Sequence, residues 1–400
     1  MESIFTCTET GGLWLPCIPG SQSNFPQSSI TGVLKIKTPK ELQTISVQLC
    51  GNYLVQLNTM GFPERYINLE LKIFEPFVED SNCEKLYGFY IENQVFYTDT
   101  DQMLNVWVKA LKKICILTHI EDDYILIKSI GKGSTSIVYL AESVASSKQV
   151  SVKCVKKSSI TSIANLMNLG NEIKILQRLK HDNICKLYYV YEDREAVYFV
   201  MEYLPHGDLL SRLNQKEKFS EVDSAKFMGK LLTTLDYLHS QNIVHRDLKL
   251  ENILMTGPND DDFKIIDFGL SYINTSPQHK KCGSPGYVAP EILRDEEYDN
   301  KIDIFSSGVI LYVLLYGKHP FEARNLDKIL QKNVECNFKT HRSTSEIASA
   351  IINLMMHPEP VARPSACQLL EVDWFGQKGK IINCSSVITS VSSVNPQIVI

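Results

Sequence analysis

The 400-residue sequence lacks three patterns that would assign a protein to a special class at once. No two of its eleven cysteines form a C-x-x-C pair, so the sequence predicts neither a zinc site nor a disulfide framework. No run of about 18 apolar residues occurs, and we therefore expect no membrane-spanning helix. The N-terminus has no basic stretch followed by an apolar one, so we expect no signal peptide. These absences together predict a cytosolic protein with reduced thiols.

The sequence also has no large excess of charge of one sign. Its 41 Lys and Arg residues against 46 Asp and Glu residues leave a formal net charge of -5, and the pI is near 6.0. This balance gives no indication of a nucleic-acid partner or of a strongly anionic membrane. A hydrophobic content of 44% is sufficient for well-packed cores, and the length is typical of two or three domains.

The predicted elements divide the chain into four parts. Residues 1–27 are rich in Gly, Pro, Ser and Thr, and are predicted to be a flexible lead-in. Residues 28–118 combine short strand-like runs with one helix. From residue 124 to residue 375 the pattern changes to strands, a helix and then a mainly helical half. Residues 376–400 form a Ser-, Val- and Ile-rich tail. The strand-like runs of the second part are Thr44–Leu49, Tyr53–Leu57, Tyr66–Ile73 and Val95–Tyr97.

Apolar stripes predict helices in both folded parts. After the polar residues Thr98–Asp101, apolar residues recur at spacings of three and four: Met103, Trp107, Ala110, Leu111 and Ile114. The same periodicity predicts two later helices, carrying Leu169, Ile173 and Leu176 in one case and Phe227, Leu231, Leu235 and Leu238 in the other. Ser220 with Asp223 resembles a capping box at the start of the latter helix.

A glycine-rich segment follows the strand-like residues Tyr124–Ile127. In Gly131-Lys-Gly-Ser-Thr-Ser-Ile-Val, the glycines would let backbone N–H groups approach phosphate oxygens without a Cβ in the way. Ile130 and Val138 would cover the flat face of a base. An ordinary hairpin turn is the alternative interpretation of this motif.

A lysine on a predicted strand is the next candidate. Lys153 ends the β-branched run Val150–Lys153, where alternation directs it to the same face as Ser151. A lysine there would bridge two phosphates if a carboxylate held it, and Glu172 on the following helix is the candidate. A solvated residue of an edge strand is the alternative.

The most specific segment is Ile243-Val-His-Arg-Asp-Leu-Lys-Leu-Glu-Asn. Asp247 would accept or orient the proton of a substrate hydroxyl, and Lys249 would neutralise a phosphoryl group in transfer. Asn252 offers a neutral oxygen ligand, and Asp267, fifteen residues later, ends an apolar strand; both suit Mg²⁺. A solvated loop of mixed charge is the alternative. Phosphoryl transfer requires positioning and charge neutralisation, and these residue types supply both.

From about residue 124 to residue 375 the chain resembles the eukaryotic protein kinase family over its full two-lobed length. The family's signatures occur in order: the glycine loop, Lys153, His245-Arg246-Asp247, Asp267-Phe268-Gly269 and Ala289-Pro290-Glu291. The resemblance implies an α+β fold, with a β-rich and an α-rich lobe and with ATP and Mg²⁺ between them. A small β-rich domain closed by one C-terminal helix would precede it. The resemblance also implies that Asp303 anchors the catalytic loop and that Arg363 pairs with Glu291.

The same resemblance implies contacts to nucleotide and substrate. The residues expected at the nucleotide are Ile130, Gly131, Lys132, Gly133, Ser134, Val138, Ser151, Lys153, Met201, Glu202, Leu204 and Leu254. Lys249 favours serine or threonine as the acceptor, because the tyrosine kinase branch typically has another residue there. The segment Cys282-Gly-Ser-Pro-Gly-Tyr-Val-Ala-Pro-Glu most resembles the calcium/calmodulin-dependent kinase group, and Ser284 keeps a hydroxyl where that group usually has threonine. Asp208 and Glu251 predict a preference for arginine upstream of the acceptor; exposed charges near a helix start are the alternative.

Several positions depart from the family pattern. Ser136, Ser151, Leu250 and Phe305 replace the usual glycine, alanine, proline and tryptophan, and these exchanges leave the phosphate and metal ligands intact. Lys280 and Lys281 stand where family members often have Thr or Ser, so we expect activity without phosphorylation at the usual place, although Arg246 resembles a phosphate sensor. The nearest upstream hydroxyls are those of Thr275 and Ser276. Cys282 is expected to be a packing residue rather than a redox switch.

Residues 28–118 resemble a pleckstrin-homology domain, with Trp107 at the place of its core tryptophan. Lys35, Lys37 and Lys40 would be the basic residues for a phosphoinositide, yet residues 1–118 contain nine Lys and Arg against twelve Asp and Glu. A protein-docking or autoinhibitory role is the alternative. The tail has no basic amphipathic helix, so no calmodulin control is expected.

Taken as a whole, the sequence predicts an ATP- and Mg²⁺-dependent protein serine/threonine kinase that acts on protein substrates. It predicts a cytoplasmic location. Recruitment to a membrane through the N-terminal domain is the alternative that the sequence leaves open. A pseudokinase or a lipid-recruited scaffold is the alternative function.

Overall fold

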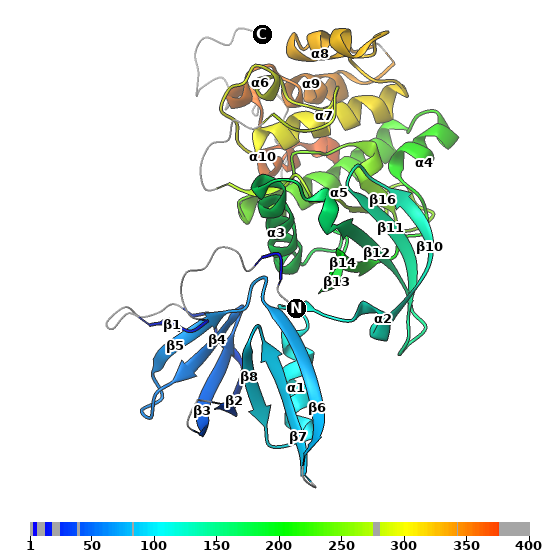
Figure 1. The fold of residues 1–400 in the computed structure, drawn as a ribbon. Coiled ribbons are helices and arrows are strands. Elements are labelled where there is room, and N and C mark those ends of the chain that lie inside the picture. Colours follow the sequence, from blue (N-terminus) through cyan, green and yellow to red (C-terminus); the bar gives the residue numbers. More distant parts are fainter. Residues whose placement is uncertain are drawn as a thin grey trace. The chain divides into compact units, whose positions relative to one another are not determined.

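The computed structural model describes residues 3–5, 13–17, 25–37, 41–81, 84–274, 281–341 and 343–375. The chain divides into two compact units (Figure 1). The N-terminal unit comprises residues 1–177 and 186–203, and the C-terminal unit comprises residues 178–185 and 204–400. Among the described residues, no helix combines the length and the apolar character needed to cross a lipid bilayer.

One sheet organises the N-terminal unit. Among the described residues it has fourteen strands, in the order β1-β5-β4-β3-β2-β8-β7-β6-β9-β13-β14-β12-β11-β10. Their bounds are β1 Leu15–Pro16, β2 Ser28–Lys37, β3 Leu42–Cys50, β4 Tyr53–Leu57, β5 Pro63–Asn68, β6 Ile73–Ser81, β7 Glu84–Ile91, β8 Gln94–Thr98, β9 Ile116–Leu117, β10 Tyr124–Lys132, β11 Ser136–Ser143, β12 Gln149–Lys156, β13 Leu187–Glu192 and β14 Ala196–Glu202. Helices α1 Asp101–Leu111, α2 Ile120–Asp123 and α3 Ile163–Arg178 complete the set.

The two-residue strand β9 joins the part before residue 118 to the part after residue 124. Ile116 and Leu117 pair in parallel with Ile73 and Phe74 of β6 on one side. On the other side they pair in parallel with Val190 and Tyr191 of β13. The sequence predicts two domains here, residues 28–118 and 124–375, and among the described residues one continuous sheet runs through parts of both. A two-residue strand carries too little periodicity to be predicted.

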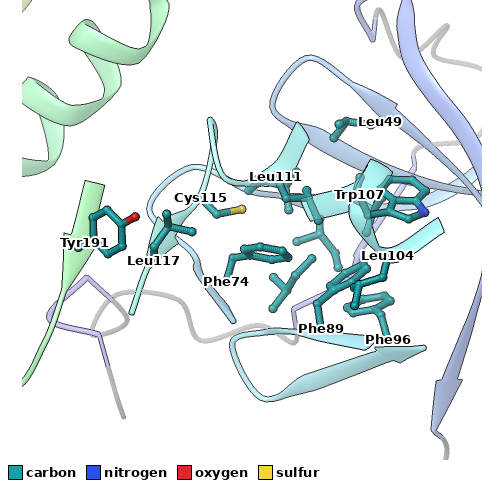
Figure 2. Packing of buried hydrophobic residues seen from close by; sticks show 14 of the residues in the cluster. Leu49, Phe74, Phe89, Phe96, Leu104, Trp107, Leu111, Cys115, Leu117 and Tyr191 are labelled. Carbon is teal, nitrogen blue, oxygen red and sulfur yellow. The ribbon is translucent and has the colours of Figure 1, made fainter. Parts of the chain in front are cut away.

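A buried apolar cluster follows the sheet across this junction (Figure 2). Trp107 of α1 is 2% exposed, and its ring centroid lies 6.4 Å from that of Phe89. Leu117 of β9 and Tyr191 of β13 belong to the same cluster, as Figure 2 shows. The region before residue 118 therefore shares its core with the strands that follow residue 124.

The structure corrects the predicted stripe of the first helix. Thr100 caps α1 by accepting a hydrogen bond from the backbone N–H of Met103, as the polar run suggested. The buried side chains are those of Leu104, Trp107 and Leu111, which lie on one face at spacings of three and four. Met103 is half-buried rather than buried, and Ile114 lies beyond the helix end at Leu111.

The predicted strand Tyr66–Ile73 is wrong, because β5 ends at Asn68 and β6 begins at Ile73. The Asn68 side chain accepts a hydrogen bond from the backbone N–H of Glu70 at 3.0 Å, and Leu71 has a φ of 60°. An asparagine that bonds its own backbone two residues on stabilises a turn in competition with a strand. The alternation of apolar residues therefore continues through the turn between β5 and β6 and gives no sign of it.

Parts of the predicted flexible lead-in are held against the N-terminal unit. Leu15 and Pro16 pair with Tyr66 and Arg65 of β5. Ser3 is buried, and its hydroxyl donates a hydrogen bond to the carboxylate of Glu192, 189 residues later in the sequence. Partners this distant leave no local sign in a Gly- and Pro-rich segment.

The C-terminal unit is mainly helical (Figure 1). Its helices are α4 Leu209–Lys216, α5 Glu221–Ser240, α6 Pro290–Leu293, α7 Lys301–Tyr316, α8 Leu326–Val334, α9 Glu346–Met355 and α10 Ala366–Leu370. The N-cap of the capping box predicted for α5 is confirmed, since the Ser220 hydroxyl accepts from the backbone N–H of Asp223 at 3.1 Å. The Asp223 carboxylate accepts from the Ser220 hydroxyl at 2.6 Å, and not from the Ser220 backbone N–H as a capping box requires. The predicted stripe of α5 is completely buried.

Two short strand pairs carry the polar loops of this unit. The strands β15 Ile243–Val244 and β18 Tyr272–Ile273 form one pair. The strands β16 Ile253–Met255 and β17 Phe263–Ile265 form the other. The segments 245–252 and 266–271 therefore start and end at neighbouring strands, which brings their side chains near one another.

Candidate active site

A lysine and a glutamate form an ion pair within the N-terminal unit. The Nζ of Lys153 on β12 lies 2.6 Å from the Oε1 of Glu172 on α3. The two side chains are 16% and 6% exposed, so little water screens their attraction. The predicted pairing is confirmed. It holds an ammonium group at a fixed place on the sheet.

The glycine-rich segment forms the turn between β10 and β11. The backbone N–H of Gly133 donates to the carbonyl of Ser136 at 2.8 Å. Gly131 is the register partner of Val138. The local geometry is a hairpin, as the alternative interpretation stated, and a role in phosphate binding is a proposal.

The other residues predicted at the nucleotide fall in both units. On neighbouring strands, Val138 pairs with Lys153 and Ser151 pairs with Met201. The Ser151 hydroxyl donates to the Glu202 carbonyl at 3.0 Å. Leu254 lies on β16, in the C-terminal unit. Four of the predicted residues therefore lie close together on three neighbouring strands of the sheet: Val138, Ser151, Lys153 and Met201.

Asp247 is the centre of a second polar cluster, within the C-terminal unit. Its Oδ1 accepts from the Ser284 hydroxyl at 2.8 Å, and its Oδ2 accepts from the Lys249 ammonium at 2.9 Å. Lys249 also donates to the Ser284 hydroxyl at 2.8 Å. The Nδ2 of Asn252 donates to the Asp247 carbonyl at 2.8 Å. A carboxylate, a cation and a hydroxyl therefore lie within hydrogen-bond distance of one another.

The backbone of this loop is held by Asp303 of α7, which is completely buried. Its carboxylate accepts from the backbone N–H groups of His245 at 2.9 Å and Arg246 at 3.0 Å, which confirms the predicted anchor. Burial raises the pKa of Asp303, but the His239 ring and the backbone donor outweigh it and leave the pKa below its ordinary value. The anchor is therefore a carboxylate anion.

Asn252 and Asp267 are brought to the same end of the β16–β17 pair. The backbone N–H of Ile266 donates to the carbonyl of Asn252 at 2.9 Å. Asp267 has a φ of 61°, and its Oδ1 accepts from the backbone N–H of Gly269 at 3.3 Å. The amide nitrogen of Asn252 is used by Asp247, which leaves the amide oxygen for another partner. Amide and carboxylate oxygens are ligands that a hard divalent cation prefers.

Comparison with known proteins agrees with this geometry. The profile of the family described as protein kinase domain matches residues 124–375. The chain belongs to the protein kinase family.

The relatives of this kinase include protein kinases with three different names, one of them a serine/threonine-protein kinase. It is 42% identical over 258 residues to a probable serine/threonine-protein kinase 2 of Plasmodium falciparum, covering 63% of this chain and 50% of that protein. It is 34% identical to CBL-interacting protein kinase 26 of Oryza sativa, covering 66% and 54%. It is 37% identical to calcium/calmodulin-dependent protein kinase type 1 of Macrobrachium nipponense, covering 68% and 80%. The kinase thus spans about half the length of the first two.

Arg246 of the kinase has partners that the sequence did not suggest. Its Nη1 donates to the Tyr298 hydroxyl at 3.1 Å, and its guanidinium lies over the Tyr272 ring at 4.6 Å from the centroid. Cys282 lies beside the same Tyr298, with 3.9 Å between sulfur and oxygen. Tyr298 is 52 residues from Arg246, so sequence spacing gave no signal. Thr275, Ser276 and Lys280 lie outside the described residues.

The two acids predicted at the peptide substrate differ in their surroundings. Asp208 caps α4, because its Oδ1 accepts from the backbone N–H of Ser211 at 2.7 Å. Glu251 is exposed in the 3-10 turn Leu250–Asn252. The helix-start alternative therefore describes Asp208, and contact of either acid with a substrate is a proposal.

A half-buried histidine, His319, packs against the segment that carries Ser284. The His319 ring lies 5.1 Å from the Tyr287 ring, and a Cβ at Gly286 would come within 2.5 Å of its Cε1. Its Nδ1 accepts from the backbone N–H of Phe321 at 3.3 Å, and its Nε2 is buried without a described partner. Burial lowers the pKa of His319 to about 4.

We expect His319 to make the kinase less stable in mild acid. Below pH 6.5, the ordinary pKa of histidine, His319 is protonated in the unfolded chain but stays neutral in the folded one. The free energy of unfolding therefore falls as the pH drops toward 4. Between pH 7 and pH 5 the loss is about 2 kcal/mol. Urea unfolding of His319→Gln should show a weaker pH dependence than wild type, whereas His206→Gln, at an exposed site, should not. Equal pH slopes for all three proteins would contradict this.

Proposed function

We propose that this kinase transfers the γ-phosphoryl group of ATP to serine and threonine hydroxyls of proteins. The observation that carries the proposal is the Asp247 carboxylate, held between the Ser284 hydroxyl and the Lys249 ammonium at 2.8 and 2.9 Å. A carboxylate placed beside a cation suits the acceptance of a hydroxyl proton next to a developing negative charge. The relatives that are named serine/threonine-protein kinases support the same activity.

In the proposed reaction Asp247 is the catalytic acceptor of the proton. The substrate hydroxyl oxygen forms a bond to the γ-phosphorus, its proton passes to the Asp247 carboxylate, and the bond to the ADP oxygen breaks. Lys249 stabilises the negative charge on the transferring group, which its contact with Asp247 positions it to do. Asp303, through the backbone of His245 and Arg246, keeps the loop in place.

Lys153 would bind nucleotide phosphates while Glu172 holds its ammonium group in position. Around them, the residues proposed at the nucleotide are Ile130, Gly131, Lys132, Gly133, Ser134, Val138, Ser151, Met201, Glu202, Leu204 and Leu254. Asn252 and Asp267 would hold Mg²⁺, and the free amide oxygen of Asn252 fits this role. When bound, the ion neutralises charge on the phosphate oxygens.

A radiolabelled-ATP assay on a peptide library tests this proposal. We expect label on peptides with serine or threonine acceptors, and none on matched tyrosine peptides or with Asp267→Ala as the background control. Arginine before the acceptor should increase the label if Asp208 and Glu251 contact the substrate. A wild-type protein that binds ATP and labels no peptide would be a pseudokinase.

We also propose that residues 28–118 form a pleckstrin-homology-like domain. The antiparallel strands β2 to β8, followed by α1 with buried Trp107, support this. A phosphoinositide site on this domain has less support, because the Lys35 ammonium is paired with Asp99 and Lys40 lies outside the described residues. We therefore propose contact with protein rather than with lipid for this domain.

A further inference from the structure

Described residues from the first 117 positions contact one face of helix α3. The Nζ of Lys174 lies 3.6 Å from the Oε2 of Glu70, and the Nε2 of Gln177 donates to the carbonyl of Ile114 at 2.8 Å. A Cβ built on Gly170 would lie 3.1 Å from the Cδ1 of Leu71 and 3.6 Å from the Cε1 of Phe5. We call Phe5, Glu70, Leu71 and Ile114 the α3 brace.

The brace lies on the side of α3 that faces away from Glu172. With 3.6 residues per turn, each residue turns the helix by about 100°, so Gly170, Lys174 and Gln177 fall within about 60° of one another. Glu172 lies about 200° round from Gly170 on the same scale. One face of α3 therefore contacts the brace, and the opposite face presents Glu172 to Lys153.

The brace is itself fixed to the sheet. Glu192 of β13 is 0% exposed, and its carboxylate accepts from the Ser3 hydroxyl at 2.7 Å and from the backbone N–H of Ile4 at 2.8 Å. The Nζ of Lys157 lies 2.7 Å from the same carboxylate. This buried, charge-assisted cluster holds the segment that carries Phe5. Strand β9, which follows Ile114, is held between β6 and β13.

We infer that the α3 brace positions α3 and thereby keeps the Lys153–Glu172 ion pair formed. The inference rests on the proposed function, in which this pair orients the nucleotide phosphates. Because the pair is closed while the brace contacts α3, the N-terminal region supports activity rather than inhibiting it. Lys174 and Gln177 are then positioning residues, which act through Glu172 without contacting the substrate.

Charge reversal in the full-length protein tests this inference. Lys174→Glu places like charges against Glu70, and the exchange Glu70→Lys with Lys174→Glu restores opposite charges. Gln177→Glu removes the amide N–H that donates to the Ile114 carbonyl, and so breaks a second contact between α3 and the brace. Lys109→Glu, on the exposed side of α1, is the matched control. The readouts are kcat/KM for ATP, KM for a peptide, and hydrogen exchange of α3 without nucleotide.

We expect Lys174→Glu and Gln177→Glu to lower kcat/KM for ATP about tenfold and to speed hydrogen exchange in α3, with the peptide KM unchanged. The charge exchange should recover most of the loss, which general damage to the fold would not allow. The inference is overturned if Lys174→Glu behaves as Lys109→Glu in kcat/KM for ATP and in hydrogen exchange of α3, or if the charge exchange shows no recovery. A wild-type protein without phosphotransfer would refute the proposed function, and hydrogen exchange would still decide whether the brace holds α3.

Discussion

Asp247→Asn should lower the turnover number about a thousandfold, because the amide cannot accept the hydroxyl proton as the carboxylate does. The amide keeps the size of the side chain and an oxygen that can still accept from Ser284 or Lys249. In the proposed mechanism Asp247 does not contact the nucleotide. We therefore expect KM for ATP to change little while kcat falls. Steady-state kinetics with a serine peptide measures both constants.

Asp327→Asn is the matched control for this prediction, since Asp327 is an exposed acid in the first turn of α8. It should leave both constants unchanged. A kcat of Asp247→Asn within a few-fold of wild type would remove Asp247 from the role of proton acceptor. A fall in kcat matched by loss of the folded state would be visible in the thermal unfolding of the same sample.

Arg363→Met should destabilise the C-terminal unit by about 3–5 kcal/mol, because it leaves the Glu291 carboxylate buried without its cation. The two side chains are 0% and 1% exposed, and the guanidinium binds both carboxylate oxygens, at 2.7 and 2.8 Å. The Arg363 guanidinium also lies over the Phe305 ring, 4.9 Å from the centroid. Urea unfolding of the full-length protein measures the loss.

The double variant Glu291→Leu with Arg363→Met should recover much of that stability, since two apolar side chains leave no buried charge. Arg294→Met is the control, because Arg294 pairs with Glu359 at 3.9 Å and both side chains are more exposed. Its loss should be below about 1 kcal/mol. If Arg363→Met costs no more than Arg294→Met, the buried pair does not contribute as proposed.

Sequence reasoning succeeded where one short segment carries all the information. The caps of α1 and α5 follow from Thr100 and Ser220, because a cap involves residues only three apart. It failed at the strand run Tyr66–Ile73, where the Asn68 turn interrupts an alternation that continues on both sides. It also placed Met103 rather than Leu104 in the buried stripe, since both positions are apolar and the helix register decides between them.

The site could be predicted only in part for a related reason. Asp247, Lys249 and Asn252 lie within six residues of one another, and the chemistry of phosphoryl transfer requires these residue types together. The contacts of Asp303 and Arg363 were implied by family resemblance and are confirmed. The partners of Arg246 were missed, because nothing in the sequence around Tyr298 indicates that it lies beside Arg246 in the fold.

The sequence alone determined the family and the groups available for chemistry, because motif order and residue type survive without any knowledge of packing. Only the tertiary structure decided how the first 117 residues relate to the strands that follow them. The two residues of β9, the Ser3–Glu192 contact and the α3 brace join segments tens to nearly two hundred residues apart. Such contacts depend on the shape of two surfaces that form only when the chain folds, so no local pattern could have predicted them.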